Sequence, residues 1–277
     1  MDSPVGIKPI MKEILKDGHV LPVDARGHLV NECSASKIAE AWRPAIEDLR
    51  QAHIDNLGSN LHSLYLRGSI PAGRARTGVS DLDSFAVVHE ASSEEASRWI
   101  KDYAADFRSR FPFCPYVEIR LLPLQPFLQS QAYQSWRFTL KVLSLCIHGE
   151  DLSPQLPKFR PTRSNGFFFF GNIFDVLTEA SSRLHQATTP EQTQKICVWA
   201  MKKILRTGFS LIMEREQVFT RDLYPSYELF SKHYPNREPE MRQALEWAVN
   251  PSSDQALISK YLGDFGGWLG NEARKSH

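Results

Sequence analysis

The apolar residues in the first half of the chain alternate between helical and strand spacing. In residues 34–56 they recur every three or four positions, which predicts an amphipathic helix, and Pro44 is expected to kink it or to delay its start. Short apolar runs typical of strands follow at 64–67 and 84–88. This part of the chain therefore combines one helix with strands in quick succession.

The alternation continues as far as residue 122. Residues 92–111 have helical spacing, and Ser92 with Glu95 forms the Ser-x-x-Glu capping box that marks a helix start. Residues 116–122 alternate well enough to form a third strand. Strands and helices in this order predict a small mixed sheet with helices packed against it.

After Pro126 the pattern becomes helical alone. The prolines at 154, 157 and 161 mark a long loop in this half, and the last residues, 271–277, are expected to fray. The predicted helices cover 129–148, 168–186, 190–215, 221–233, 238–248 and 252–262.

The two patterns predict an α+β fold with two domains. The first covers residues 1–126, with an N-terminal extension at 1–33, and contains the mixed sheet. The second covers residues 127–277 and is an all-helical bundle. A chain of 277 residues is long enough for two domains, and its 42% apolar content is ample for their cores.

The overall charge limits the classes of partner. Lys and Arg number 33 against 32 Asp and Glu, so the net charge is +1 and the pI is near 7.7. This balance gives no global attraction to a polyanion, so nucleic acid is not expected as the principal partner. The oligomeric state cannot be read from the sequence.

The cysteines and the N-terminus bear on localisation. Cys33, Cys114, Cys146 and Cys197 are far apart and have no metal-ligand spacing, so they are expected to be reduced core thiols. Residues 1–20 lack the apolar core of a signal peptide, and no apolar tract is long enough to span a membrane. We therefore expect a cytoplasmic protein.

The chemistry is concentrated in one segment, residues 64–87, whose sequence is LYLRGSIPAGRARTGVSDLDSFAV. Its first strand is expected to end at Gly68-Ser69, where small side chains let main-chain N–H groups approach a phosphate. Asp81 and Asp83 then point to one face of the next strand, because strand side chains alternate. Two carboxylates on one face repel each other and can together bind a hard cation, which we expect to be Mg²⁺.

Further charged residues surround this pair. Glu118, on the third predicted strand, would add a third carboxylate as a metal ligand or as a general base, whereas the alternative is a surface residue paired with Arg120. Arg74 and Arg76 in the intervening loop fit phosphate contacts and loop solvation equally well. Three convergent acids are enough for one or two metal ions.

The residues Gly68-Ser69, Gly73, Ser80-Asp81-Leu82-Asp83 and the later Glu118 resemble the signature of the nucleotidyltransferase superfamily that includes DNA polymerase β. The chain is most similar to the aminoglycoside adenylyltransferase branch, of the streptomycin and spectinomycin type. The spacer between Gly68-Ser69 and Asp81 is about one residue longer than is common in the family. The resemblance implies that residues 1–126 form the catalytic domain and that 127–277 close over the nucleotide.

The resemblance also implies roles for individual residues. Gly68, Ser69, Ser80, Arg74 and Arg76 would bind the nucleotide, while Asp81, Asp83 and Glu118 would bind the metal and perform catalysis. In the helical half, Arg206 and Arg221 match positions that contact nucleotide phosphates. Both could equally complement a helix end or cover apolar surface with their stems.

The implied activity is transfer of a nucleoside monophosphate to a hydroxyl group, with Mg²⁺ as cofactor and ATP as the co-substrate. The acceptor would be a small molecule, with an aminoglycoside as the first candidate and antibiotic resistance as the corresponding role. Two alternatives stay open. The nucleotide could move to a protein or a tRNA end, although the charge argues against tRNA, or the chain could be a non-catalytic nucleotide-binding module.

Overall fold

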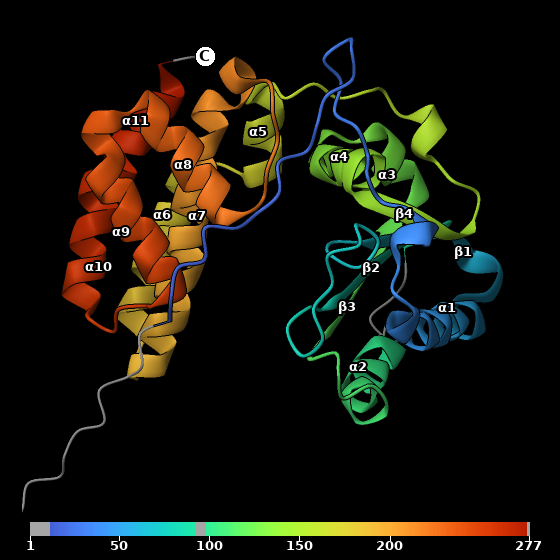
Figure 1. Ribbon diagram of the computed structural model, residues 1–277. Coiled ribbons are helices and arrows are strands. Elements are labelled where there is room, and N and C mark those ends of the chain that lie inside the picture. The colour runs from blue at the N-terminus through green and yellow to red at the C-terminus, as the bar shows by residue number, and fades with distance from the viewer. Residues whose placement is uncertain (1–11, 92–97, 276–277) are drawn as a thin grey trace, which may run out of the picture. The chain divides into compact units, whose positions relative to one another are not determined.

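The computed structural model (Figure 1) describes residues 12–91 and 98–275. The chain divides into two compact units. One unit spans Val23–Arg160 and is called the sheet unit here; the other contains residues up to Pro22 together with Pro161–His277 and is called the helical unit. This α+β organisation, with a four-stranded sheet and a separate helical region, confirms the predicted fold class.

The sheet has four strands in the order β3-β2-β1-β4. Strand β1 is antiparallel to both β2 and β4, whereas β2 and β3 are parallel, so the sheet is mixed as predicted. The strands are β1 (Leu61–Arg67), β2 (Leu82–Val88), β3 (Val117–Pro123) and β4 (Ser144–Gly149).

Helices cover both faces of this sheet (Figure 1). On one face, Leu66 and Leu82 pack with Phe107 of α2 and with residues of α1. On the other face, Tyr65 and Phe85 pack with residues of α3 and α4. The four helices are α1 (Arg43–Leu57), α2 (Arg98–Arg110), α3 (Leu124–Gln129) and α4 (Gln134–Leu143), with short 3₁₀ turns at Ala35–Lys37, Glu40–Trp42, Gly58–Asn60, Gln131–Tyr133 and Ser153–Gln155.

Three helix predictions in this unit need comment. Pro44 lies in the first turn of α1, and the regular helix begins at Arg43 rather than at residue 34, as Pro44 led us to expect. The capping box at Ser92–Glu95 lies outside the described residues. The helix predicted over 129–148 is wrong in its last turn and a half, because Ser144–Gly149 forms β4, which pairs with the open edge of β1.

Strand β4 also moves the boundary between the two parts of the chain. We expected the first domain to end at residue 126, but the sheet is completed only at Gly149 and the compact unit extends to Arg160. The N-terminal extension is divided as well. Leu21 forms a β-bridge with Phe219, so the described residues 12–22 belong with the helical unit.

The helical unit is built around α7, which is 27 residues long and begins with a capping box formed by Thr189 and Gln192. Its other elements pack along α7 or beside it. They are α5 (Arg163–Phe170), α6 (Ile173–Gln186), α7 (Pro190–Glu216), α8 (Leu223–His233), a 3₁₀ turn (Pro235–Arg237), α9 (Glu238–Val249), α10 (Gln255–Tyr261), a π-helical turn (Leu262–Gly266) and α11 (Gly267–Arg274).

Two predictions in this unit were wrong in detail. The helix predicted over 168–186 is two helices, because Gly171 has φ +87° and the Asn172 side chain caps the start of α6. The segment expected to fray from residue 271 continues α11 as far as Arg274. Within the part of the chain that the structure describes, no helix combines the length and apolar character needed to cross a bilayer.

Candidate functional site

Three neighbouring strands bring three charged residues into line. In the sheet register Arg67 of β1 is opposite Asp83 of β2, and Asp83 is opposite Glu118 of β3. All three alternate with residues such as Leu66 and Leu82 that face α1 and α2, so their side chains lie on the other face of the sheet. The sequence predicted that Asp83 and Glu118 would converge, and the register confirms this.

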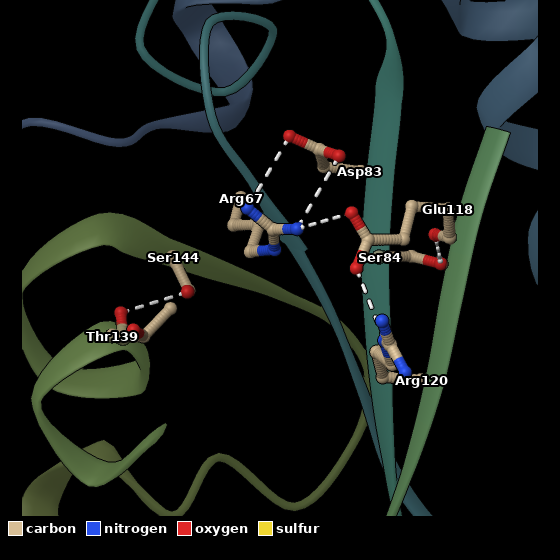
Figure 2. Close-up of polar contacts among 7 residues, drawn as sticks. All are labelled: Arg67, Asp83, Ser84, Glu118, Arg120, Thr139 and Ser144. Atoms are coloured by element: carbon tan, nitrogen blue, oxygen red, sulfur yellow. Dashed lines mark hydrogen bonds and ion pairs between the residues drawn. The ribbon is translucent and has the colours of Figure 1, made fainter. Parts of the chain in front are cut away.

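Arg67 connects the two carboxylates (Figure 2). Its Nη2 donates to Glu118 Oε2 at 2.8 Å, and its Nη1 lies 3.4 Å from Asp83 Oδ2. The guanidinium is 12% exposed, the two carboxylates are 23% and 28% exposed, and solvent therefore screens these pairs only in part. Arg67 thus supplies a positive charge that offsets the repulsion between Asp83 and Glu118.

Arg67 was not among the site residues predicted from the sequence. A signal was present, since a basic residue ends an apolar strand directly before Gly68 and has the strand parity of Tyr65. Register with Asp83 and Glu118 could not be inferred without knowing that β1 lies between β2 and β4. Long-range pairing rather than local pattern makes this residue part of the site.

Glu118 has two basic neighbours. Arg120 donates from Nε to Glu118 Oε1 at 3.1 Å, as its position two residues along the strand predicted, and Arg67 holds the other oxygen. Burial alone would raise the pKa of Glu118, but the charges and hydrogen bonds of Arg67 and Arg120 outweigh it and lower the pKa below its usual value of 4.5. Glu118 is therefore ionised at neutral pH, with both of its oxygens held by arginines.

Gly68 leaves space beside Asp83. It has φ +85°, and a Cβ at this position would lie 2.9 Å from Asp83 Oδ2. Both the left-handed backbone and this close approach require glycine. The predicted turn after β1 is thus confirmed, and it lets the Gly68 backbone approach the Asp83 carboxylate closely.

The loop after Gly68 is closed by its own hydrogen bonds. The N–H of Arg74 donates to the Ser69 carbonyl at 2.8 Å, and the N–H of Arg76 donates to Ser80 Oγ at 2.9 Å. The buried Ser80 hydroxyl therefore organises the turn at 76–80, while the side chains of Arg74 and Arg76 are exposed. The main-chain N–H groups of Gly73, Arg74, Arg76 and Ser80 are therefore engaged within the loop, and its basic side chains are the groups that face solvent.

Asp81 lies at the start of β2. The strand begins at Leu82 and Asp81 is the exposed residue just before it, close to the exposed strand start that we expected for the pair. Partial burial and then the negative charge of Glu118 raise the pKa of Asp81 above 3.8. Asp81 is thus close enough to Glu118 for mutual repulsion, which a bound cation would relieve.

The carboxylates give an incomplete set of metal ligands. In the ranges 12–91 and 98–275, no group of three or more His, Cys, Asp or Glu side chains is arranged to hold a metal ion. Asp83, which lies against the Gly68 turn, and Asp81 with its raised pKa have the hard oxygen donors that suit Mg²⁺. These residues fit an ion whose other ligands are phosphate and water.

The helical unit holds a second basic group, which we call the cation cluster: Lys203, Arg206 and Arg221. Arg206 Nε donates to the Arg221 carbonyl at 3.2 Å, and Lys203 Nζ donates to the Phe170 carbonyl at 3.3 Å. The Arg221 guanidinium lies 5.5 Å from the centre of the Phe169 ring. The predicted pair Arg206 and Arg221 does come together, and the sequence missed Lys203.

Electrostatics in the cation cluster favour an anion. Burial lowers the pKa of Arg206, and burial followed by the charges of Arg206 and Arg221 lowers the pKa of Lys203. Burial and the charge of Arg206 also lower the pKa of Lys202. Asp222 opposes this effect at Arg206 and Glu179 opposes it at Lys203, but burial dominates, and such partly desolvated cations would gain from a bound anion.

The site residues predicted from the sequence therefore fall into two groups. Gly68, Ser69, Ser80, Asp81, Asp83 and Glu118 gather at the ends of β1, β2 and β3, with Arg74 and Arg76 on the adjoining loop. Arg206 and Arg221 lie in the helical unit.

Comparisons with known proteins show a likeness in fold but none in sequence. No family model matches the chain, and no curated protein matches it in sequence. Among solved structures, the chain is similar to spectinomycin adenyltransferase AAD(9) from Enterococcus faecialis, solved with ATP and spectinomycin. The TM-score is 0.50 at 14% identity, over 84% of this chain and 99% of that chain. This likeness supports the α+β fold, with its small sheet and helical region.

Proposed function

We propose that the chain is a Mg²⁺-dependent nucleotidyltransferase that transfers AMP from ATP to a hydroxyl group of a small molecule. The observation that carries the proposal is the register of Asp83 with Glu118 directly beside the Gly68-Ser69 turn. Carboxylates next to a turn with accessible main-chain N–H groups are what a metal-bound triphosphate requires. The fold shared with an adenyltransferase solved with ATP supports the same conclusion.

The residues have distinct roles in this proposal. Asp81 and Asp83 hold Mg²⁺, which when bound neutralises charge on the triphosphate. Gly68, Ser69, Ser80 and the loop arginines Arg74 and Arg76 hold the phosphates. Glu118, an ionised carboxylate, accepts the proton of the acceptor hydroxyl or completes a second metal site.

The reaction balances without a further reactant. The acceptor oxygen attacks the α-phosphorus in line, and the bond between that phosphorus and the oxygen bridging to the β-phosphorus breaks. Pyrophosphate leaves with the electron pair, while the hydroxyl proton moves to Glu118. Most of the acceleration comes from positioning and charge neutralisation.

The cation cluster gives the helical unit a part in the proposal. Arg206 and Arg221, together with Lys203, would contact the nucleotide phosphates, which offset their desolvation and mutual repulsion. We propose an aminoglycoside as the acceptor, since AAD(9) was solved with spectinomycin and is similar in fold. Resistance to such an antibiotic would be the biological consequence.

The test is pyrophosphate release from each of the four NTPs with Mg²⁺, in the presence of streptomycin, spectinomycin or another aminoglycoside. Asp83→Asn removes the charge at constant shape and should lower acceptor-dependent release by at least about 100-fold. Asp106→Asn is the matched control, because Asp106 is a solvent-exposed residue of α2, and it should release pyrophosphate at the wild-type rate.

Two outcomes would count against the proposal. Near-wild-type turnover by a folded Asp83→Asn protein would show that the site is assigned wrongly. Release that does not depend on any small acceptor, together with label on the protein itself, would favour a protein-modifying enzyme instead.

A further inference from the structure

The helical unit contains a cavity of about 510 Å³ that the proposed function does not use. It lies among α5, α6, α7 and α11. Apolar surface dominates its lining, with Ile173, Phe174 and Leu211 as the large apolar residues. A cavity of this size accommodates a small organic molecule.

The polar groups of the cavity have one sign of charge. Arg163 and Arg274 are the charged residues among its lining, and they come from α5 and α11 respectively. The first residues of α6, Ile173 and Phe174, also line it, and a helix N-terminus carries partial positive charge. None of the described residues that line it is acidic.

Arg163 has unused hydrogen-bonding capacity. Its Nη2 is buried and finds no hydrogen-bond partner among the described residues, which is costly for a guanidinium nitrogen. The nearby carboxylate of Glu214 accepts instead from the main-chain N–H of Arg163, at 3.1 Å. Arg163 is also one of the residues that line the cavity, so its positive charge would attract an anionic group bound there.

Arg274 and the hydroxyl groups complete the arrangement. The Arg274 guanidinium lies 3.8 Å from the centre of the Phe174 ring, which orients it without neutralising its charge. Glu272, its near neighbour on α11, is paired with Lys275 at 3.0 Å. Ser164, Thr207 and Ser210 add hydroxyl groups to the lining.

We propose that this cavity binds a small molecule with one anionic group and an apolar body. The anionic group meets Arg163 and Arg274, and the apolar body lies against Ile173, Phe174 and Leu211. A polycationic aminoglycoside has the opposite charge, so the occupant is a different molecule from the proposed acceptor. The binding is independent of the nucleotidyltransferase proposal, because every residue involved belongs to the helical unit.

The experiment is a fluorescence titration of the full chain with 8-anilinonaphthalene-1-sulfonate, without nucleotide or metal. N-phenyl-1-naphthylamine has the same ring system without the sulfonate and reports apolar binding alone. Arg163→Met and Arg274→Met should each weaken binding of the sulfonate probe by about tenfold or more, and should leave binding of the neutral probe unchanged.

Arg183→Met is the matched control. Arg183 is another arginine of the helical unit stacked on an aromatic ring, 4.8 Å from the centre of Trp199, and it does not line the cavity. Its substitution should not change the affinity for the sulfonate probe. Arg274 is exposed near the end of α11, so its variant keeps the test valid if Arg163→Met does not fold.

Three results would overturn the proposal. Equal affinity of wild type and Arg274→Met for the sulfonate probe would show that charge is not recognised. Equal affinity of the wild-type protein for the neutral and the anionic probe would also show that the cavity does not recognise the negative charge. Displacement of the probe by ATP would assign the cavity to the nucleotide.

Discussion

Arg67, Asp83 and Glu118 show how individual residues acquire their chemistry from their neighbours. Each carboxylate of this pair repels the other, and the Arg67 guanidinium between them offsets that repulsion. The carboxylates and the Gly68 turn could be predicted from local sequence. Gly-Ser after an apolar run indicates a tight turn, and Asp-x-Asp places two carboxylates where they can bind one cation. Arg67 and Lys203 could not, because their partners lie far away in the sequence.

Gly68→Ala tests the close approach of the Gly68 backbone to Asp83. A methyl group there would lie 2.9 Å from Asp83 Oδ2 and displace the carboxylate, so we expect at least a tenfold loss of AMP transfer. Gly78→Ala is the control, because Gly78 has φ +75° but no atom within 4 Å of a Cβ. Both variants should lose about 1–2 kcal/mol of stability from backbone strain. Equal transfer by the two variants would contradict the role of Gly68.

His53 gives the sheet unit a pH dependence. Burial lowers its pKa from 6.5 to about 4, opposed in part by its hydrogen bond to the Leu49 carbonyl. Between pH 4 and pH 6.5 the unfolded chain binds a proton at His53 that the folded chain does not bind. The contribution of His53 to the free energy of unfolding should therefore be fully present above pH 6.5, and the free energy of unfolding should fall by about 3 kcal/mol as the pH drops to 4.

Urea unfolding at pH 7.5 and pH 5, followed by circular dichroism, measures this loss. His53→Gln should reduce the difference between the two pH values, whereas His185→Gln, at an exposed position on α6, should keep it. An unchanged pH difference in His53→Gln would show that His53 is not its source.

At the scale of elements, the junction between α4 and β4 is where the sequence-based prediction failed most clearly. Residues 129–148 have enough apolar positions for one helix, yet the chain leaves the helix at Leu143 to complete the sheet beside β1. Local spacing cannot show that β1 has an unpaired edge. The three strands predicted from their own apolar runs, by contrast, were confirmed within a few residues.

Asn31 is expected to hold this junction in place. Its Nδ2 donates to the carbonyls of Ser144 at 2.8 Å and Lys141 at 3.2 Å, and its Oδ1 accepts from the Cys33 N–H. Asn31→Ala removes these bonds and should lower the free energy of unfolding by about 1–3 kcal/mol in urea titrations.

Asn56→Ala is the matched control for this prediction. The Asn56 amide donates within its own helix, to the Ala52 carbonyl, and is exposed, so the loss should stay within about 0.5 kcal/mol. Equal losses in the two variants would mean that Asn31 does not stabilise the start of β4.

At the scale of the whole molecule, the chain consists of a unit with carboxylates and a unit with the cation cluster. The α+β class and the succession of most helices could be predicted, because each has its own periodicity. The division of the chain into its two units could not be predicted, because residues 12–22 join the helical unit through contacts with residues such as Phe219 and Asp222. Those contacts span about two hundred positions in the sequence.

In the proposed reaction, the α-phosphoryl group of a nucleotide, with its nucleoside, moves to an acceptor. The most direct measurement compares ATP labelled at the α-phosphorus with ATP labelled at the γ-phosphorus, each incubated with Mg²⁺, spectinomycin and the full chain. We predict that the α label appears on the acceptor, that the γ label leaves as pyrophosphate, and that Asp83→Asn abolishes both. Transfer of the γ label to the acceptor would show a kinase, and transfer of the α label by Asp83→Asn at the wild-type rate would show that the chemistry takes place elsewhere.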